Sequence, residues 1–114
     1  MPLIRFDMLE GRSEKELTAI LDAAHQAMLD AFGVPPRDRY QIIYEHKKSR
    51  VRIEDTGLGI TRTDDVMIIS VTTRPRSVDE KTAFYRLLTE ALTAKCGIAS
   101  SDVMVNYVEN TDAD

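Results

Sequence analysis

Hydrophobic and polar positions alternate with two different periods along the chain. Apolar residues recur at every third or fourth position from Leu17 to Ala31, which is the spacing of one helix face. A second stripe of the same kind includes Phe84 to Leu92. Short apolar runs flank the two stripes, at residues 3–6, 40–44, 66–71 and 103–108. The pattern predicts strand, helix and strand, repeated once, with a short edge strand over residues 50–55.

Both predicted helices have the same boundary signals. Each begins with a serine that a glutamate follows three residues later, in Ser13–Glu16 and Ser77–Glu80. This spacing is typical of a capping box, in which each side chain accepts a backbone hydrogen bond from the other residue. Each stripe then ends at a glycine, Gly33 or Gly97. The sequence therefore predicts two helices of similar length and construction.

The two halves match at a constant offset of 64 residues, as from Ser13 to Ser77. Caps, terminal glycines and the aspartates that follow them all recur at this offset, which indicates an internal duplication. We predict one domain over residues 1–114, with repeat units at roughly 2–46 and 66–110. Identical pairs are Ile4/Ile68, Arg12/Arg76, Glu16/Glu80, Gly33/Gly97, Asp38/Asp102 and Glu45/Glu109.

A strand–helix–strand unit pairs its two strands in parallel. Two such units side by side predict an α/β (α+β) fold, with a four-stranded core sheet and two helices on one face. The opposite sheet face would lack a cover in a single copy. Because a chain of 114 residues needs to bury that face, we expect an oligomer.

Composition narrows the class of protein. Hydrophobic residues make up 43% and charged residues 30%, as in globular proteins, and no apolar run approaches the roughly 20 residues that span a bilayer. The net charge of −4 argues against a nucleic-acid partner, and we interpret the basic residues at 47–52 as a solvated loop. A single cysteine and the lack of a signal peptide predict a cytoplasmic protein that does not bind membranes.

Pro2 is the first candidate for chemistry, because removal of Met1 would expose a secondary amine on a rigid ring. Its counterpart in the second repeat, at the same offset, is Val66, so only the first unit carries this group. Taken singly, Asp38, Arg74 and Arg76 also fit a surface ion pair or a solvated turn.

Other candidates have plainer interpretations. We expect His25 at a helix flank or interface, His46 beside a loop without a metal-ligand partner, and Cys96 as a buried, inert thiol. The glycines of residues 57–59 lack the context of a phosphate-binding loop. Tyr40 fits a place near Asp38 or an interface equally well.

The proline directly after Met1, the duplicated strand–helix–strand unit and the two arginines after the third core strand together resemble the tautomerase superfamily. Within it, they are most similar to malonate semialdehyde decarboxylase and its relatives. The combination of Pro2, Asp38, Arg74 and Arg76 is the most specific part of the resemblance. The resemblance spans nearly the whole chain, and the residues that carry it are 2–7, 10–12, 36–42, 53–58, 74–77 and 108–110.

The resemblance implies a homotrimer of duplicated units with no metal or organic cofactor and a small carboxylate substrate. It implies catalytic roles for Pro2 and Asp38, and substrate binding by Arg74 and Arg76. A nearby carboxylate raises the pKa of an amine, whereas a desolvated pocket with arginines lowers it. A protonated Pro2 suits decarboxylation of malonate semialdehyde or a similar 3-oxo acid, and a neutral one suits keto–enol tautomerisation of small 2-oxo acids. Hydration by an activated water and a non-catalytic trimeric module are further alternatives.

Overall fold

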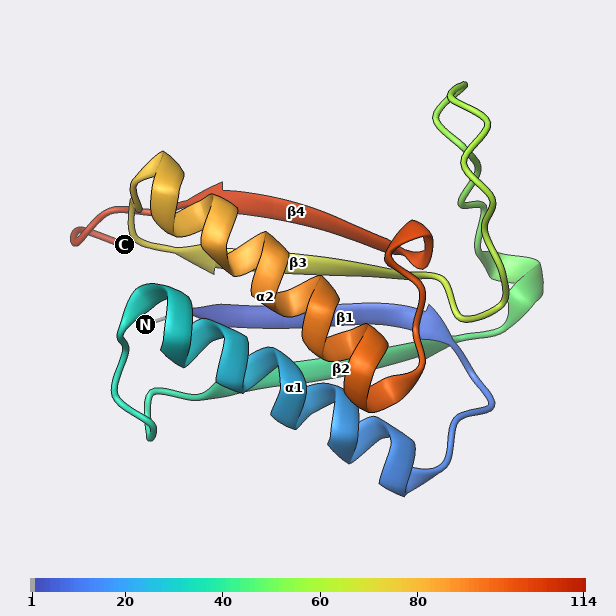
Figure 1. Cartoon of the computed structure of the whole chain (residues 1–114), viewed down its shortest axis with the longest axis horizontal. Coiled ribbons are helices and arrows are strands. Elements are labelled where there is room, and N and C mark those ends of the chain that lie inside the picture. The colour runs from blue at the N-terminus through green and yellow to red at the C-terminus, as the bar shows by residue number, and fades with distance from the viewer. Residues whose placement is uncertain (1) are drawn as a thin grey trace.

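The computed structural model describes residues 2–114 and has a helical layer on one face of a single sheet (Figure 1). The sheet has the order β2-β1-β3-β4, and its two central strands, β1 and β3, are antiparallel. Each outer strand is parallel to its inner neighbour, as the duplication predicts. The elements are β1 (Leu3–Leu9), α1 (Glu14–Phe32), β2 (Tyr40–His46), β3 (Met67–Thr73), α2 (Val78–Cys96) and β4 (Val103–Glu109).

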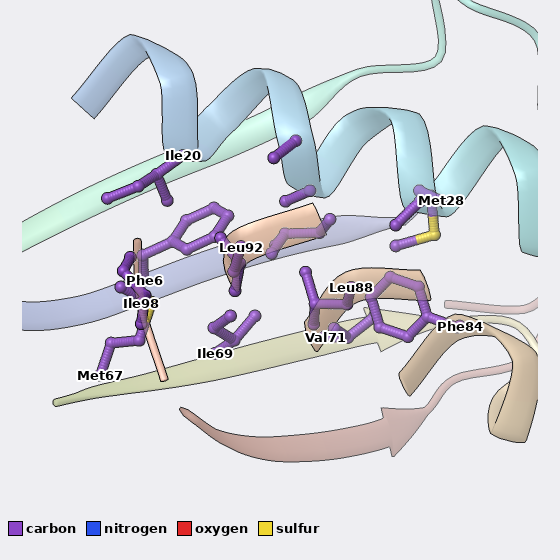
Figure 2. Close-up of a cluster of buried hydrophobic side chains, with 14 of the residues drawn as sticks. Phe6, Ile20, Met28, Met67, Ile69, Val71, Phe84, Leu88, Leu92 and Ile98 are labelled. Atoms are coloured by element: carbon purple, nitrogen blue, oxygen red, sulfur yellow. The ribbon is translucent and has the colours of Figure 1, made fainter. Parts of the chain in front are cut away.

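The hydrophobic core fills the space between the sheet and the two helices (Figure 2). Alternate residues of the central strands point into it, such as Phe6 and Ile69, which are fully buried. The helices contribute Met28 from α1 and Leu88 from α2, on the stripes that the periodicity predicts. The predicted fold is therefore confirmed.

Both capping boxes form as expected. The Ser13 hydroxyl accepts from the Glu16 backbone at 3.2 Å, and the Ser77 hydroxyl accepts from the Glu80 backbone at 3.1 Å. Each helix ends at a glycine in the left-handed region, where residues with a side chain are strained. These caps set the two ends of each helix.

The second face of the sheet has no cover within one copy of the described chain. Its outer strand β2 presents Tyr40, Ile42 and Tyr44 with 40–48% of their surface exposed, and β4 presents Val108. The middle of this open face is more polar and includes Arg5. Apolar side chains along both edges of an uncovered sheet indicate a surface that packs against another molecule.

The predicted edge strand over residues 50–55 is wrong. The segment begins with a single 3-10 turn, Lys48–Arg50, and continues as an irregular arm that projects beyond the sheet (Figure 1). The hydrogen bonds of residues 50–55 themselves are local: the Asp55 carboxylate accepts from the backbones of Gly57 and Gly59. A strand needs a neighbouring strand to pair with, and the segment turns away from the sheet instead.

Asp102 fastens the base of this arm. Its carboxylate is 1% exposed and accepts from the Thr63 backbone at 2.6 Å and from the Thr63 hydroxyl at 2.5 Å. The sequence pairs Asp102 with the candidate Asp38. In the second repeat, this position therefore serves to hold the chain's own arm.

The offset of 64 residues does not hold without a gap. Ile4 faces the helices and is 3% exposed, whereas Ile68 lies on the other face of the sheet. The strand pairing gives the correct match. In the first repeat, Pro2 lies opposite Arg39 by continuation of the register. In the second repeat, the residue equivalent to Arg39 is Val103, and Val103 pairs with Met67. The counterpart of Pro2 is therefore Met67 rather than Val66. The first unit still carries the proline that the second lacks.

Candidate active site

The four candidate residues lie at one end of the sheet, the end at which β1 begins and β4 ends (Figure 1). Pro2 directly precedes β1, whose first residue, Leu3, pairs with the first residue of β2 and with Thr72 near the end of β3. Asp38 lies in the loop that enters β2, and Arg74 and Arg76 lie in the loop that leaves β3. The fold thus places Pro2 between the aspartate loop and the arginine loop.

Pro2 is buried, and the direction of its nitrogen follows from the strand pairing. The Thr73 carbonyl accepts from the Asn110 backbone at 2.8 Å, so the backbone groups of Thr73 point toward β4. Thr73 lies opposite Pro2 by continuation of the register. In an antiparallel pair, opposite residues direct their backbone groups both inward or both outward. The Pro2 nitrogen therefore points toward β2, the side from which the Asp38 loop approaches. Met1, whose removal would free this nitrogen, lies outside the described residues.

Hydrogen bonds hold the loop that carries Asp38. The Asp38 backbone donates to the Pro35 carbonyl at 2.9 Å, which closes a turn. The His25 ring nitrogen Nε2 lies 2.9 Å from the Pro36 carbonyl and ties the loop to α1. The helix-flank interpretation of His25 is confirmed. Asp38 itself is half-buried.

Arg76 is half-buried and packs on an aromatic ring. Its guanidinium carbon lies 4.9 Å from the centre of the Phe32 ring, a cation–π contact. Its Nε is buried and has no hydrogen-bond partner among residues 2–114, and the same holds for the Thr73 hydroxyl. A buried polar group without a partner costs about 1–3 kcal/mol. Arg76 is thus held by packing, with hydrogen-bonding capacity unused.

Arg74 is in different surroundings, because 61% of its side chain is exposed. Its Nε lies 2.8 Å from Asp112 Oδ1, and a terminal nitrogen lies 3.3 Å from Oδ2 of the same carboxylate. Its backbone carbonyl accepts from the Tyr107 hydroxyl at 3.2 Å. Arg74 therefore already engages a carboxylate through two nitrogens, the geometry with which arginine binds carboxylate ligands.

Three residues of this region escaped the sequence analysis. Phe32 belongs to α1 and Tyr107 to β4, where both fit the hydrophobic pattern, and the rings pack edge to face with centres 6.4 Å apart. Burial raises the pKa of the Tyr107 phenol. Asp112 lies in a short polar segment without a motif. Periodicity shows that such residues face inward or outward, but it does not show which arginine they contact.

The remaining candidates lie elsewhere. Tyr40 faces the open side of the sheet, away from the buried side on which Pro2 lies, so its interface interpretation is favoured. His46 Nε2 lies 2.7 Å from Asp7 Oδ1 on the neighbouring strand. Burial raises the pKa of the Cys96 thiol, which disfavours the reactive thiolate.

Two further features of residues 2–114 concern metal ions and membranes. They contain no group of three or more His, Cys, Asp or Glu side chains arranged to hold a metal ion. None of their helices combines the length and the apolar character needed to cross a bilayer.

Two family models, each described as "Tautomerase enzyme", match the chain. One matches residues 38–114 and the other residues 2–60. Among curated proteins, "Probable tautomerase YrdN" of Bacillus subtilis (strain 168) is 51% identical over the whole chain, which covers 88% of that protein. "Probable tautomerase YusQ" of the same organism is 30% identical over the whole chain, which covers 91% of it.

Solved structures of two decarboxylases are also similar. A crystallographic study of wild-type, proline-to-alanine mutant and inactivated malonate semialdehyde decarboxylase, which addresses decarboxylase and hydratase activities, gives a TM-score of 0.95 at 50% identity. The alignment covers 98% of this chain and 87% of that one. FG41 malonate semialdehyde decarboxylase inhibited by 3-bromopropiolate gives 0.90 at 40% identity, over 96% of this chain and 83% of that one.

Proposed function

The chain belongs to the tautomerase superfamily, and from that premise we propose that it is a cofactor-independent decarboxylase of malonate semialdehyde or a similar short 3-oxo acid. The observation that carries the proposal is the meeting of Pro2, Asp38 and the two arginines at one end of the sheet. The similarity to two malonate semialdehyde decarboxylases, at 50% and 40% identity, favours this substrate class.

The reaction needs a cation near the 3-carbonyl oxygen of the substrate. When the bond between C2 and the carboxylate carbon breaks, carbon dioxide leaves and the electron pair moves into an enolate. A positive charge at the enolate oxygen stabilises this developing charge. The enolate then takes a proton at C2, and malonate semialdehyde yields acetaldehyde.

We assign that cation to the Pro2 amine, with Met1 removed. The Pro2 nitrogen points toward β2, whose entering loop carries Asp38. At about 4 Å and an effective dielectric constant near 20, an ion pair gains roughly 4 kcal/mol before the cost of desolvation. A carboxylate on that side favours the protonated amine at neutral pH. Asp38 thus keeps Pro2 protonated, and in a hydration reaction it would activate a water.

The arginines hold the substrate carboxylate. Arg76 has a buried Nε without a partner among residues 2–114, and Arg74 engages the Asp112 carboxylate through two nitrogens. A grip that is equally strong in the ground state and the transition state does not speed the reaction. We therefore assign to both arginines the orientation of the substrate, with its 3-carbonyl directed at Pro2.

The test is turnover of malonate semialdehyde by protein whose intact mass shows that Met1 is absent. We expect acetaldehyde and carbon dioxide from the wild type. A protein with one extra glycine before Pro2 keeps the ring but turns the amine into an amide, and its turnover should fall about a hundredfold or more, the scale of losing a positioned acid. Pro2→Ala is the matched control, because it keeps a terminal amine but loses the rigid ring. Turnover no faster than in buffer would refute the proposal.

A second candidate function is keto–enol tautomerisation of small 2-oxo acids with Pro2 as a neutral base. The 51% identity to a probable tautomerase favours it. The two functions differ in the preferred protonation state of Pro2. Turnover no faster than in buffer on substrates of both kinds, in wild type and Pro2→Ala alike, would instead favour a non-catalytic module.

We also propose that this single-domain chain works as a homotrimer. The open face, with apolar side chains along β2 and β4, supports association, and the resemblance to the tautomerase superfamily implies three copies. Three copies could cover one another's open faces around a common axis.

A further inference from the structure

The contact between Asp112 and Arg74 sets the charge of the candidate site. Asp112 engages the arginine that we assign to the substrate carboxylate, with nitrogen–oxygen distances of 2.8 and 3.3 Å. The pair is solvent-accessible, since 61% of the Arg74 side chain and 77% of the Asp112 side chain are exposed. A substrate carboxylate can therefore reach Arg74 beside Asp112 or in its place.

The segment that carries Asp112 has a defined backbone. The Asn110 backbone donates to the Thr73 carbonyl at 2.8 Å, which joins the segment to the end of β3. The Asp114 carboxylate accepts from the backbone and the hydroxyl of Thr111, at 2.8 and 3.1 Å, and the Asp114 backbone donates to the Thr111 carbonyl. These bonds lower the pKa of the Asp114 carboxyl, which keeps it ionised as the acceptor. Asp112 lies inside this closed turn, which holds it beside Arg74.

The balance of charge at the site depends on this residue. With the Pro2 amine protonated, three cations, Pro2, Arg74 and Arg76, lie at this end of the sheet, and Asp112 places a carboxylate directly on one of them. Asp112 therefore offsets the charge of Arg74, which leaves less positive charge for a second carboxylate of a ligand. Without the charge of Asp112, Arg74 would offer its full charge to that second carboxylate. The nearby Lys81 and Glu109 form their own pair at 2.6 Å and do not alter this balance.

We propose that Asp112 is a specificity-determining residue that makes the site select monocarboxylates over dicarboxylates. This inference rests on the proposed function, whose substrates carry a single carboxylate. A second carboxylate near Arg74 would meet the negative charge of Asp112, and like charges at close range repel. The first carboxylate of the ligand is repelled less by Asp112, because it can bind Arg76 instead of Arg74.

Binding of two unreactive anions tests the proposal. Malonate carries two carboxylates, and 3-hydroxypropanoate has the same chain with one. Dissociation constants for both are measured by NMR titration in wild type, Asp112→Asn and Asp112→Glu. Exposed ion pairs contribute about 0.2–1 kcal/mol, so Asp112→Asn should tighten malonate roughly 1.4- to fivefold relative to 3-hydroxypropanoate. Asp112→Glu restores the charge and should move the ratio back toward that of wild type.

Glu90→Gln is the matched control. Glu90 pairs with Arg86 on the exposed side of α2 at 3.6 Å and is as accessible as Arg74, so its loss changes net charge away from the site. We expect no change in the ratio for this variant. An unchanged ratio in Asp112→Asn, an equal change in Glu90→Gln, or no binding of either anion would overturn the proposal. Because these readouts need no turnover, a failure to decarboxylate malonate semialdehyde would count against the proposed function alone.

Discussion

The two arginines of the candidate site illustrate how neighbours change the role of one residue type. Arg76 packs on the Phe32 ring, which limits the directions its guanidinium can take. Arg74 extends into solvent and is held by a carboxylate. A residue that is fixed by packing loses less conformational freedom when it binds a ligand. Arg76 should therefore contribute more to orienting the substrate than Arg74 does.

Replacement of Phe32 tests this role of packing. Phe32→Leu removes the ring under Arg76 but keeps a large apolar side chain, and the cation–π contact is worth about 0.5–2 kcal/mol. We expect KM for the substrate to rise about two- to thirtyfold with a smaller change in kcat. Phe84→Leu is the control, because its ring packs on Phe32 with centres 5.2 Å apart and no Arg76 contact of its own is found among the described residues. A similar KM in both variants would contradict a specific role for Phe32.

At the scale of the elements, the helix caps are the features that sequence reasoning captured best. The capping boxes and terminal glycines are local, so the residues that form them lie within a few positions of one another. The prediction of a strand over residues 50–55 failed because a strand depends on a partner elsewhere in the chain. The one-residue shift between the first strands of the two repeats was missed for the same reason, since it is visible only in the pairing with β2 and β4.

The capping carboxylates make helix stability depend on pH. Hydrogen bonds from the backbone and side chain of Ser77 lower the pKa of Glu80 below its ordinary value of 4.5. A lowered pKa in the folded state means that the ionised group adds stability above the unfolded value, and that this stability is lost as the pH falls through the folded pKa. Glu80→Gln should melt below wild type at pH 7, and the difference should shrink between pH 4.5 and 3. A constant difference over that range would contradict this account.

The site shows a limit of reasoning from sequence alone. Pro2, Asp38, Arg74 and Arg76 stand out in the sequence because their combination resembles the tautomerase superfamily. Phe32 and Asp112 have no such mark. Their contacts with Arg76 and Arg74 join residues that are far apart in the sequence, and they emerge only when helix and strand ends are placed together.

At the scale of the whole molecule, the open face of the sheet is the surface through which we propose that copies associate. Tyr44 on β2 is 44% exposed, and a glutamate at this position would place a charge on the surface that we expect to be buried between copies. We predict that Tyr44→Glu sediments as a smaller species than wild type. Val78→Glu is the control, because Val78 is 77% exposed at the start of α2, on the helical side. An unchanged sedimentation coefficient in Tyr44→Glu would show that copies associate through another surface.

The protonation state of the Pro2 amine is the most direct test of the central claim. It can be measured by 15N NMR titration of protein that lacks Met1. The account predicts a pKa above the ordinary α-amino range of about 7.7–8.0, and a lower value in Asp38→Asn. A wild-type pKa below that range, unchanged in Asp38→Asn, would contradict the assignment of Pro2 as the acid and would favour its action as a base.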